Sequence, residues 1–129
     1  MIIDTSAIIA ILANEAEAPV FAKAIKQHRC AISAATLLET EIVVSSRLGP
    51  DAVRDLRLAL QSADVEIVPF DARQAEIASE AYLRFGRGSA HPAKLNYGDC
   101  FSYALAILRD EPLLAKGDDF AHTDVQPAE

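Results

Sequence analysis

Four short, continuous runs of apolar residues alternate along the chain with longer segments in which apolar residues recur at helical spacing. Runs of this kind are typical of strands whose two faces are both covered by other elements. We therefore expect strands at Met1–Asp4, Cys30–Ser33, Val65–Phe70 and Pro112–Ala115, with a short fifth strand near Val125.

The segments between these runs show the apolar spacing and the boundary residues of helices. Gly49 ends the third of them, and Asp71 with Gln74 forms a capping-box pair at the start of the fifth. Helices are expected over residues 5–15, 17–28, 34–49, 51–62, 72–85 and 96–110. This alternation predicts an α/β fold in which helices flank a mainly parallel central sheet, and 129 residues suit a single domain, 1–129.

Composition supports a folded core and suggests a location. Hydrophobic residues make up 51% of the chain and tryptophan is absent, so aliphatic side chains are expected to form most of the core. No apolar run is long enough to span a membrane, and Asp4 interrupts any leader-like segment at the start. Cys30 and Cys100 form no CxxC pair, which predicts two reduced thiols in a cytoplasmic protein.

Acidic residues occur at or near the ends of the predicted strands. Asp4 ends the first strand, and Asp118 and Asp119 follow the fourth. Glu39 lies two turns into the helix after the second strand, and Asp99 lies in the first turn of the helix before the fourth. Because ligands of parallel sheets sit outside the carboxyl ends of the strands, these acids are expected to converge on one rim.

Each acid also has an ordinary structural explanation. Asp4 is a good helix N-cap, and Asp99 stands at capping-box spacing from Asn96. Asp118 and Asp119 follow a glycine in a turn, where aspartate is common. Glu39 could complete a capping box with an earlier threonine, although Ser33 is the better helix start and would leave this glutamate in mid-helix.

A carboxylate cluster of this kind suits a divalent cation, since like charges held together repel one another and a cation removes that penalty. Hard oxygen ligands favour Mg²⁺ or Mn²⁺, and a water polarised by such an ion can attack a phosphodiester. The hydroxyls of Thr5 and Ser6 could orient the first carboxylate. Zinc fits less well, because the three histidines are scattered over His28, His91 and His122.

Residues 81–98 contain no acid in a chain whose net charge is −7. They carry Arg84, Arg87 and Lys94, and aromatic residues are interleaved with these cations. A nucleic-acid backbone that passes an acidic rim needs positive partners, and aromatic rings can stack on unpaired bases. The segment is therefore a candidate RNA-binding loop, with a solvated loop as the simpler alternative.

Four motifs in this order resemble those of the PIN-domain ribonucleases, and more narrowly the VapC toxins of bacterial type II toxin–antitoxin systems. They are "MIIDTSAIIAIL", "LLETEIV", "LNYGDCFSYALA" and "LLAKGDDFAHTD", and the resemblance covers nearly the whole chain. It implies a Rossmann-like three-layer α/β/α sandwich and a Mg²⁺- or Mn²⁺-dependent endoribonuclease. It also implies tRNA or another structured RNA as substrate, inhibition by a cognate VapB antitoxin, and a homodimer.

Carried over motif by motif, the resemblance implies that Asp4, Glu39 and Asp99 are catalytic and ligate the metal. Asp118 is our choice for the fourth acid, with Asp119 shaping the turn. Many relatives carry an acid directly after a basic residue in this loop, whereas here Lys116 is followed by glycine. The sequence thus leaves the choice between the two aspartates open.

Two other classes of protein share some of these features. A phosphotransfer receiver domain also has acids at strand ends, but its phospho-accepting residue would have to be Asp71, which the capping role already explains. A catalytically silent PIN-fold domain that binds a partner is the second alternative, and Leu58, off the apolar face of its helix, could mark its interface.

Overall fold

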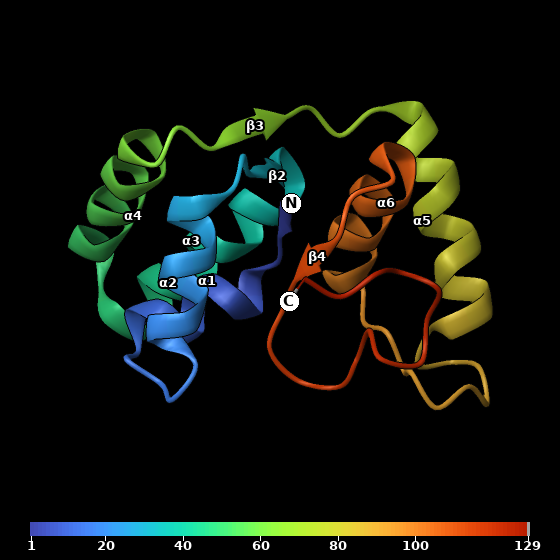
Figure 1. Ribbon diagram of the computed structural model, residues 1–129. Helices are drawn as coiled ribbons and strands as arrows, with labels where there is room; N and C mark the ends of the chain where they lie inside the picture. The colour runs from blue at the N-terminus through green and yellow to red at the C-terminus, as the bar shows by residue number, and fades with distance from the viewer. Residues whose placement is uncertain (129) are drawn as a thin grey trace.

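A four-stranded parallel sheet forms the centre of the computed structural model, which describes residues 1–128 (Figure 1). The strands are β1 (Ile2–Ile3), β2 (Ala31–Ser33), β3 (Glu66–Val68) and β4 (Leu113–Leu114), in the spatial order β3-β2-β1-β4. Every neighbouring pair is parallel. The order reverses beside β1, because β2 and β3 extend the sheet on one side and β4 joins on the other.

The helices begin and end close to the predicted boundaries. They are α1 (Thr5–Leu12), α2 (Ala18–Gln27), α3 (Ala34–Leu48), α4 (Pro50–Ser62), α5 (Ala72–Phe85) and α6 (Asp99–Arg109). Ser33 caps α3 by accepting a hydrogen bond from the Ala35 amide, so Glu39 lies in mid-helix as expected. Asp71 caps α5 through the Gln74 amide, which confirms its structural role.

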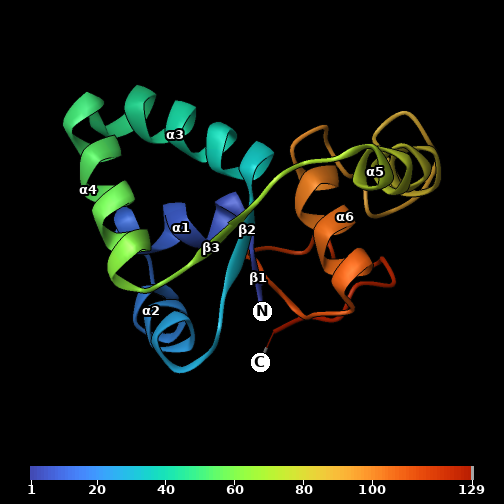
Figure 2. The ribbon, with the colours of Figure 1, turned by 90° about the horizontal axis from the view of Figure 1, so that it is seen from above.

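Successive residues of each strand face opposite sides of the sheet and enter separate cores. Ile2 packs in a core with α5 and α6, whereas Ile3 packs in a core with helices α1 to α4. Leu113 and Leu114 divide between the two cores in the same way. Seen from above, α1 to α4 lie on one side of the strands and α5 and α6 on the other (Figure 2). This is the predicted three-layer α/β/α arrangement.

The predicted fifth strand near Val125 is reduced to a single bridge between Leu113 and Pro127. The Leu113 amide donates to the Gln126 carbonyl, and the Ala128 amide donates to the Leu113 carbonyl. Proline cannot donate a backbone hydrogen bond, which limits a ladder at this point. No helix in the described part of the chain combines the length and apolar character needed to cross a bilayer.

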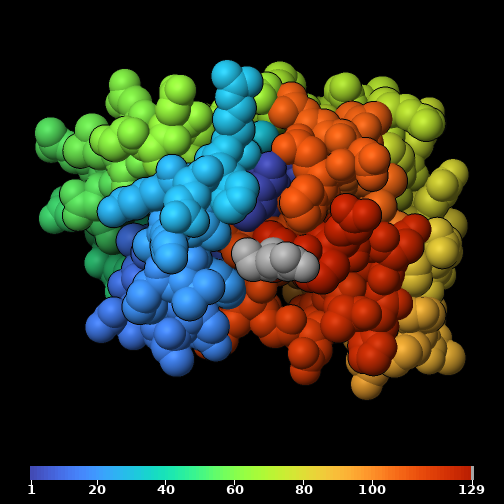
Figure 3. All heavy atoms as spheres, in the orientation of Figure 1, coloured from blue at the N-terminus to red at the C-terminus, as the bar shows by residue number. Residues whose placement is uncertain are grey.

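The reversal of strand order brings distant parts of the chain together at the carboxyl ends of β1 and β4. In the space-filling view, N-terminal segments (blue to cyan) meet C-terminal segments (orange to red) across the middle of the molecule (Figure 3). The residues that follow β1 and β4 therefore share one rim of the sheet. In parallel sheets this reversal is where ligand sites form.

Candidate active site

Asp4 follows β1 and is buried, with both carboxylate oxygens already hydrogen-bonded. Its Oδ2 accepts from the Ser6 amide at 3.0 Å and from the Ser6 hydroxyl at 2.7 Å, so the residue caps α1 as well. Its Oδ1 accepts from the Ser102 hydroxyl on α6 at 2.5 Å. The Lys116 amide in turn donates to Ser6 Oγ at 2.9 Å. These contacts fix the carboxylate in one orientation, which offsets the cost of burying its charge.

Glu39 projects from α3 toward the same rim and is half-buried. Its Oε1 accepts a 2.5 Å hydrogen bond from the Thr5 hydroxyl, which also lies 2.9 Å from the Thr40 hydroxyl. Burial raises the pKa of Glu39, as does the charge of nearby Asp4, while the bond from Thr5 acts in the opposite direction. The sequence predicted that both hydroxyls would orient Asp4. In the structure the Ser6 hydroxyl bonds to Asp4 and the Thr5 hydroxyl bonds to Glu39.

Asp99 stands at the first position of α6 and is about nine-tenths buried. It exchanges two hydrogen bonds with Asn96: the Asn96 amide donates to Asp99 Oδ2 at 3.0 Å, and the Asp99 amide donates to Asn96 Oδ1 at 2.9 Å. The pKa of Asp99 is raised to about 7, chiefly by burial and also by the charges of Asp4, Asp119 and Glu39, against the lowering effect of the hydrogen bond from the Asn96 amide. Asp99 therefore makes the reciprocal bonds of a helix start and also belongs to the acidic cluster.

The turn after β4 brings Asp119 to the cleft, whereas Asp118 is not among the residues that line it. Gly117 has φ +94°, a conformation that favours glycine, and it redirects the chain before the two acids. The Asp118 carbonyl then accepts from the Ala121 amide at 3.0 Å, which closes the turn. The choice of Asp118 over Asp119 as the fourth acid finds no support in this geometry, because only Asp119 lines the cleft.

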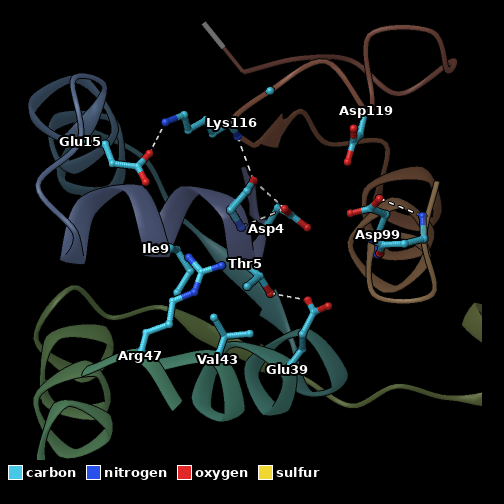
Figure 4. A pocket seen from close by; sticks show the side chains of 13 residues that line it. Asp4, Thr5, Ile9, Glu15, Glu39, Val43, Arg47, Asp99, Lys116 and Asp119 are labelled. Atoms are coloured by element: carbon cyan, nitrogen blue, oxygen red, sulfur yellow. Dashed lines mark hydrogen bonds and ion pairs between the residues drawn. The ribbon is translucent and has the colours of Figure 1, made fainter. Parts of the chain in front are cut away.

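The acids from these four segments line one open cleft with a volume of about 440 Å³ (Figure 4). In the close-up, Asp99 and Asp119 lie on one side and Glu39 and Thr5 on another, with Asp4 at the centre. The cleft is lined by Asp4, Thr5, Ser6, Ile9, Glu15, Glu39, Val43, Arg47, Asn96, Asp99, Lys116, Gly117 and Asp119.

Within residues 1–128, no group of three or more histidine, cysteine, aspartate or glutamate side chains forms a ready-made metal cage. The prediction that Asp4, Glu39, Asp99 and Asp118 ligate a metal therefore stays a prediction. The carboxylates of Asp4, Glu39 and Asp99 are each held by hydroxyl or amide partners of their own, and like charges disfavour closer approach. The donor set still fits Mg²⁺ or Mn²⁺, because Mg²⁺ takes only one or two carboxylates directly and keeps several waters.

The three basic residues predicted to bind RNA lie outside the cleft. Arg84 stands 3.8 Å from Asp124 and its guanidinium lies 4.5 Å from the Phe85 ring centre, in a separate pocket beside α5 and α6. Arg87 and Lys94 are exposed on the loop between α5 and α6 and do not line the acidic cleft. The structure thus does not bring these three cations to the acids.

Two residues of the site were missed from the sequence, although helical spacing carried a signal for both. Ser102 follows Asp99 by three residues, which places both on one face of α6, and its hydroxyl reaches Asp4. Arg47 follows Glu39 by eight residues, with Val43 halfway, so all three lie along one face of α3 and line the cleft.

Gly98 fits against the carboxylate of Glu39, and a methyl group there would overlap it. The backbone of Gly98 (φ −65°, ψ −37°) suits alanine, so Gly98→Ala should change unfolding free energy by only about 1 kcal/mol. We expect it to lower RNA-cleavage rates by roughly 10- to 100-fold, because it displaces Glu39. Gly88→Ala is the matched control in rate assays, since nothing lies within 4 Å of its added methyl. Equal rates for the two variants would contradict the prediction.

The fold and the site define the class of protein: a parallel α/β/α sandwich with an acidic cleft at the carboxyl ends of its strands. Comparison with known proteins identifies the family. The PIN domain family matches residues 1–126. The Mycobacterium bovis protein VapC ribonuclease Mb0625 and the Mycobacterium tuberculosis protein Ribonuclease VapC28 are each 52% identical over 129 residues, 99% of this chain and 97% of theirs. The chain therefore belongs to the PIN-domain family and, within it, to the VapC ribonucleases.

Solved structures agree on the fold. The crystal structure of Mycobacterium tuberculosis VapC20, described as a sarcin–ricin loop cleaving toxin, has a TM-score of 0.74 at 21% identity and covers 98% of both chains. A toxin–antitoxin complex from Klebsiella pneumoniae has a TM-score of 0.70 at 23% identity over 99% of this chain and 98% of that one. At these identities the likeness establishes the shared architecture alone.

Proposed function

We propose that this protein is the toxin of a type II toxin–antitoxin pair and hydrolyses RNA phosphodiester bonds with the help of Mg²⁺ or Mn²⁺. The observation that carries the proposal is the convergence of Asp4, Glu39, Asp99 and Asp119, from four separate segments, on one open cleft. The charge of Asp4 raises the pKa values of Glu39 and Asp99, and a divalent cation would balance the charge of such a site. The full-length identity to VapC ribonucleases supports RNA as the substrate.

The four acids are proposed to divide the work. Asp4 and Asp99, both buried and held by neighbouring side chains, would hold the cation, with Asp119 on its solvent side. When bound, a divalent cation supplies a polarised water and neutralises charge that develops on the phosphate. Glu39 is the proposed acceptor of the proton released by the attacking water, because its raised pKa makes it a better base than an exposed glutamate.

A VapB-type antitoxin is the proposed protein partner. Complexes of toxins with antitoxins occur among the solved structures of this fold, including VapBC2 from Rickettsia felis. An apolar groove adjoins the acidic cleft and shares Glu39 with it. Its wall includes the exposed side chains of Leu38, Ile42 and Tyr97, which are 60%, 61% and 78% exposed. Apolar side chains gathered on a surface in this way support contact with a protein.

Removal of divalent cations tests the proposal. The purified protein should cleave bulk RNA in buffer with Mg²⁺ or Mn²⁺, stop in excess EDTA, and recover when Mg²⁺ is added back. Product ends are measured on denaturing gels, which also separate internal cleavage from digestion at the ends. Undiminished cleavage in EDTA would rule out the metal mechanism, and no cleavage with either cation would favour a catalytically silent partner-binding domain.

A further inference from the structure

The lining of the acidic cleft contains five acids and two basic side chains, Arg47 and Lys116. RNA brings its own negative charge into this cleft, and the whole chain carries a net charge of −7. Cations bound to the acids would offset only the charge at the reacting phosphate. The phosphates on either side of it need positive partners from the protein.

Lys116 is already engaged by two acids of the segment between α1 and α2. Its ammonium group forms an ion pair with Glu15 and lies 3.4 Å from Glu17. The hydrogen bond that Lys116 donates to Glu15 is the largest cause that raises the pKa of Lys116. This side chain therefore holds the turn after β4 against the end of α1, and its charge is largely balanced within the protein.

Arg47 differs from Lys116 because it forms no ion pair with any residue in the part of the chain that the structure describes. It is exposed in the last turn of α3, and its side chain extends over Ile9 and Val43 toward the centre of the cleft (Figure 4). Eight residues of α-helix separate it from Glu39, which corresponds to about 12 Å along the axis. The two residues thus stand more than two helical turns apart on one face of α3.

We propose that Arg47 binds a phosphate of the RNA backbone neighbouring the one that is cleaved, so that the strand runs along α3 from Glu39 toward the end of this helix. The proposal rests on the ribonuclease function proposed above. A guanidinium can hold a phosphate through two parallel hydrogen bonds, and an arginine without an acidic partner loses no ion pair when it does so. The apolar side chains of Ile9 and Val43 support its aliphatic stem without competing for the charge.

This placement replaces the basic loop as the main source of backbone contacts at the site. Arg84 is near Asp124 in another pocket, and Arg87 and Lys94 do not line the cleft. Arg47, in contrast, lies on the same helix face as Glu39 and lines the same cavity as all four acids. One strand of RNA could therefore meet the acids and Arg47 at the same time.

The test compares Arg47→Ala and Arg47→Lys with Arg54→Ala, an exposed arginine on α4 outside the cleft. Binding of a fluorescent single-stranded RNA is measured by anisotropy in Mg²⁺ over a range of salt, with Asp99→Asn present in every variant to prevent cleavage. The same RNA is then used with one uncharged methylphosphonate linkage at each position in turn. Cleavage rates are measured in parallel with Asp99 intact, and thermal unfolding verifies that the variants are folded.

We expect Arg47→Ala to weaken RNA binding about ten-fold and to lower the salt slope of log K by about 0.7, as one lost phosphate contact requires. KM should rise while kcat changes little, and Arg47→Lys should restore part of the affinity. A methylphosphonate linkage at one position of the RNA should weaken its binding to the Asp99→Asn parent. The same linkage should not weaken binding to the Arg47→Ala variant, which has already lost that contact. Arg54→Ala should match the parent throughout.

Three results would overturn the inference, and they are distinguishable. If the wild-type protein cleaves RNA but Arg47→Ala matches Arg54→Ala in affinity, salt slope and KM, Arg47 does not contact the backbone. If Arg47→Ala weakens only the antitoxin complex, the residue belongs to the protein interface instead. A wild-type protein that neither binds nor cleaves RNA would overturn the proposed function as well. Binding and cleavage assays with the wild-type protein reveal that case directly.

Discussion

Asp99→Asn is expected to abolish RNA cleavage and at the same time to stabilise the protein at pH 8 when divalent cations are removed. Asp99 is buried among Asp4, Glu39 and Asp119, and its pKa is raised to about 7. At pH 8 the folded protein must keep this carboxylate ionised in unfavourable surroundings. Asparagine removes the charge yet can still accept the hydrogen bond from the Asn96 amide.

The pH dependence follows from the direction of this shift. Between about pH 4 and pH 7 the folded state holds a proton on Asp99 that the unfolded state has released, so the free energy of unfolding falls as pH rises through this range. The penalty is fully present above pH 7 and is relieved as pH falls toward 4. We expect Asp99→Asn to gain about 2 kcal/mol at pH 8, less than the full shift implies, because water reaches part of the carboxylate.

Thermal unfolding in EDTA at pH 8 and at pH 5 measures this effect. A gain of about 2 kcal/mol corresponds to a rise in Tm of roughly 6 °C in a chain of this size. The gain should shrink at pH 5, and Mg²⁺ should raise the Tm of the wild type more than that of Asp99→Asn. Asp55→Asn, an exposed acid on α4, is the control for a general effect of net charge. A variant that is inactive and also less stable at pH 8 would contradict the prediction.

Asp119→Asn should reduce RNA cleavage by about 100-fold or more, whereas Asp118→Asn should stay within about two-fold of the wild type. The two residues are adjacent and both exposed, but only Asp119 lines the cleft and raises the pKa of Asp99. The substitutions remove the same charge from the same turn. Their difference therefore isolates the direction of the side chain from the general charge of the loop.

Single-turnover cleavage assays with both variants at saturating Mg²⁺ measure this difference. Titration with Mg²⁺ adds a second readout, since Asp119→Asn should need more cation for half-maximal protection against unfolding and Asp118→Asn should not. The opposite ranking of the two variants would restore Asp118 as the fourth acid. Equal losses in both would mean that the turn as a whole, rather than one carboxylate, contributes to the site.

The sequence predicted the fold and three of the five acids that line the cleft from simple rules. Short apolar runs identified all four strands, and the rule for parallel sheets placed Asp4, Glu39 and Asp99 near one rim. The choice between Asp118 and Asp119 depended on the left-handed backbone at Gly117 and on the turn that closes at Ala121. Residue types alone predict neither the backbone conformation of Gly117 nor the point at which this turn closes.

The basic residues show a second limit of sequence-based reasoning. Clustering along the chain suggested Arg84, Arg87 and Lys94, but the C-terminal segment brings Asp124 to Arg84. Arg47 has no other basic residue close to it in the sequence, so the clustering of charge did not indicate it. The RNA-binding role that we propose for it depends on the helix face that it shares with Glu39. The fifth strand predicted near Val125 is likewise reduced to one bridge, because Pro127 has no amide to extend the ladder.

The strand order also determines when during synthesis the acidic cleft can form. β1 pairs with β4 directly, and Ile2 lies opposite Leu113, more than a hundred residues later in the chain. Asp119 and the Lys116 amide that supports Ser6 come later still. A growing chain on the ribosome that has not passed residue 119 therefore lacks one edge of its sheet and one side of its cleft. The cleft that we propose cleaves RNA cannot form until these residues have left the ribosome.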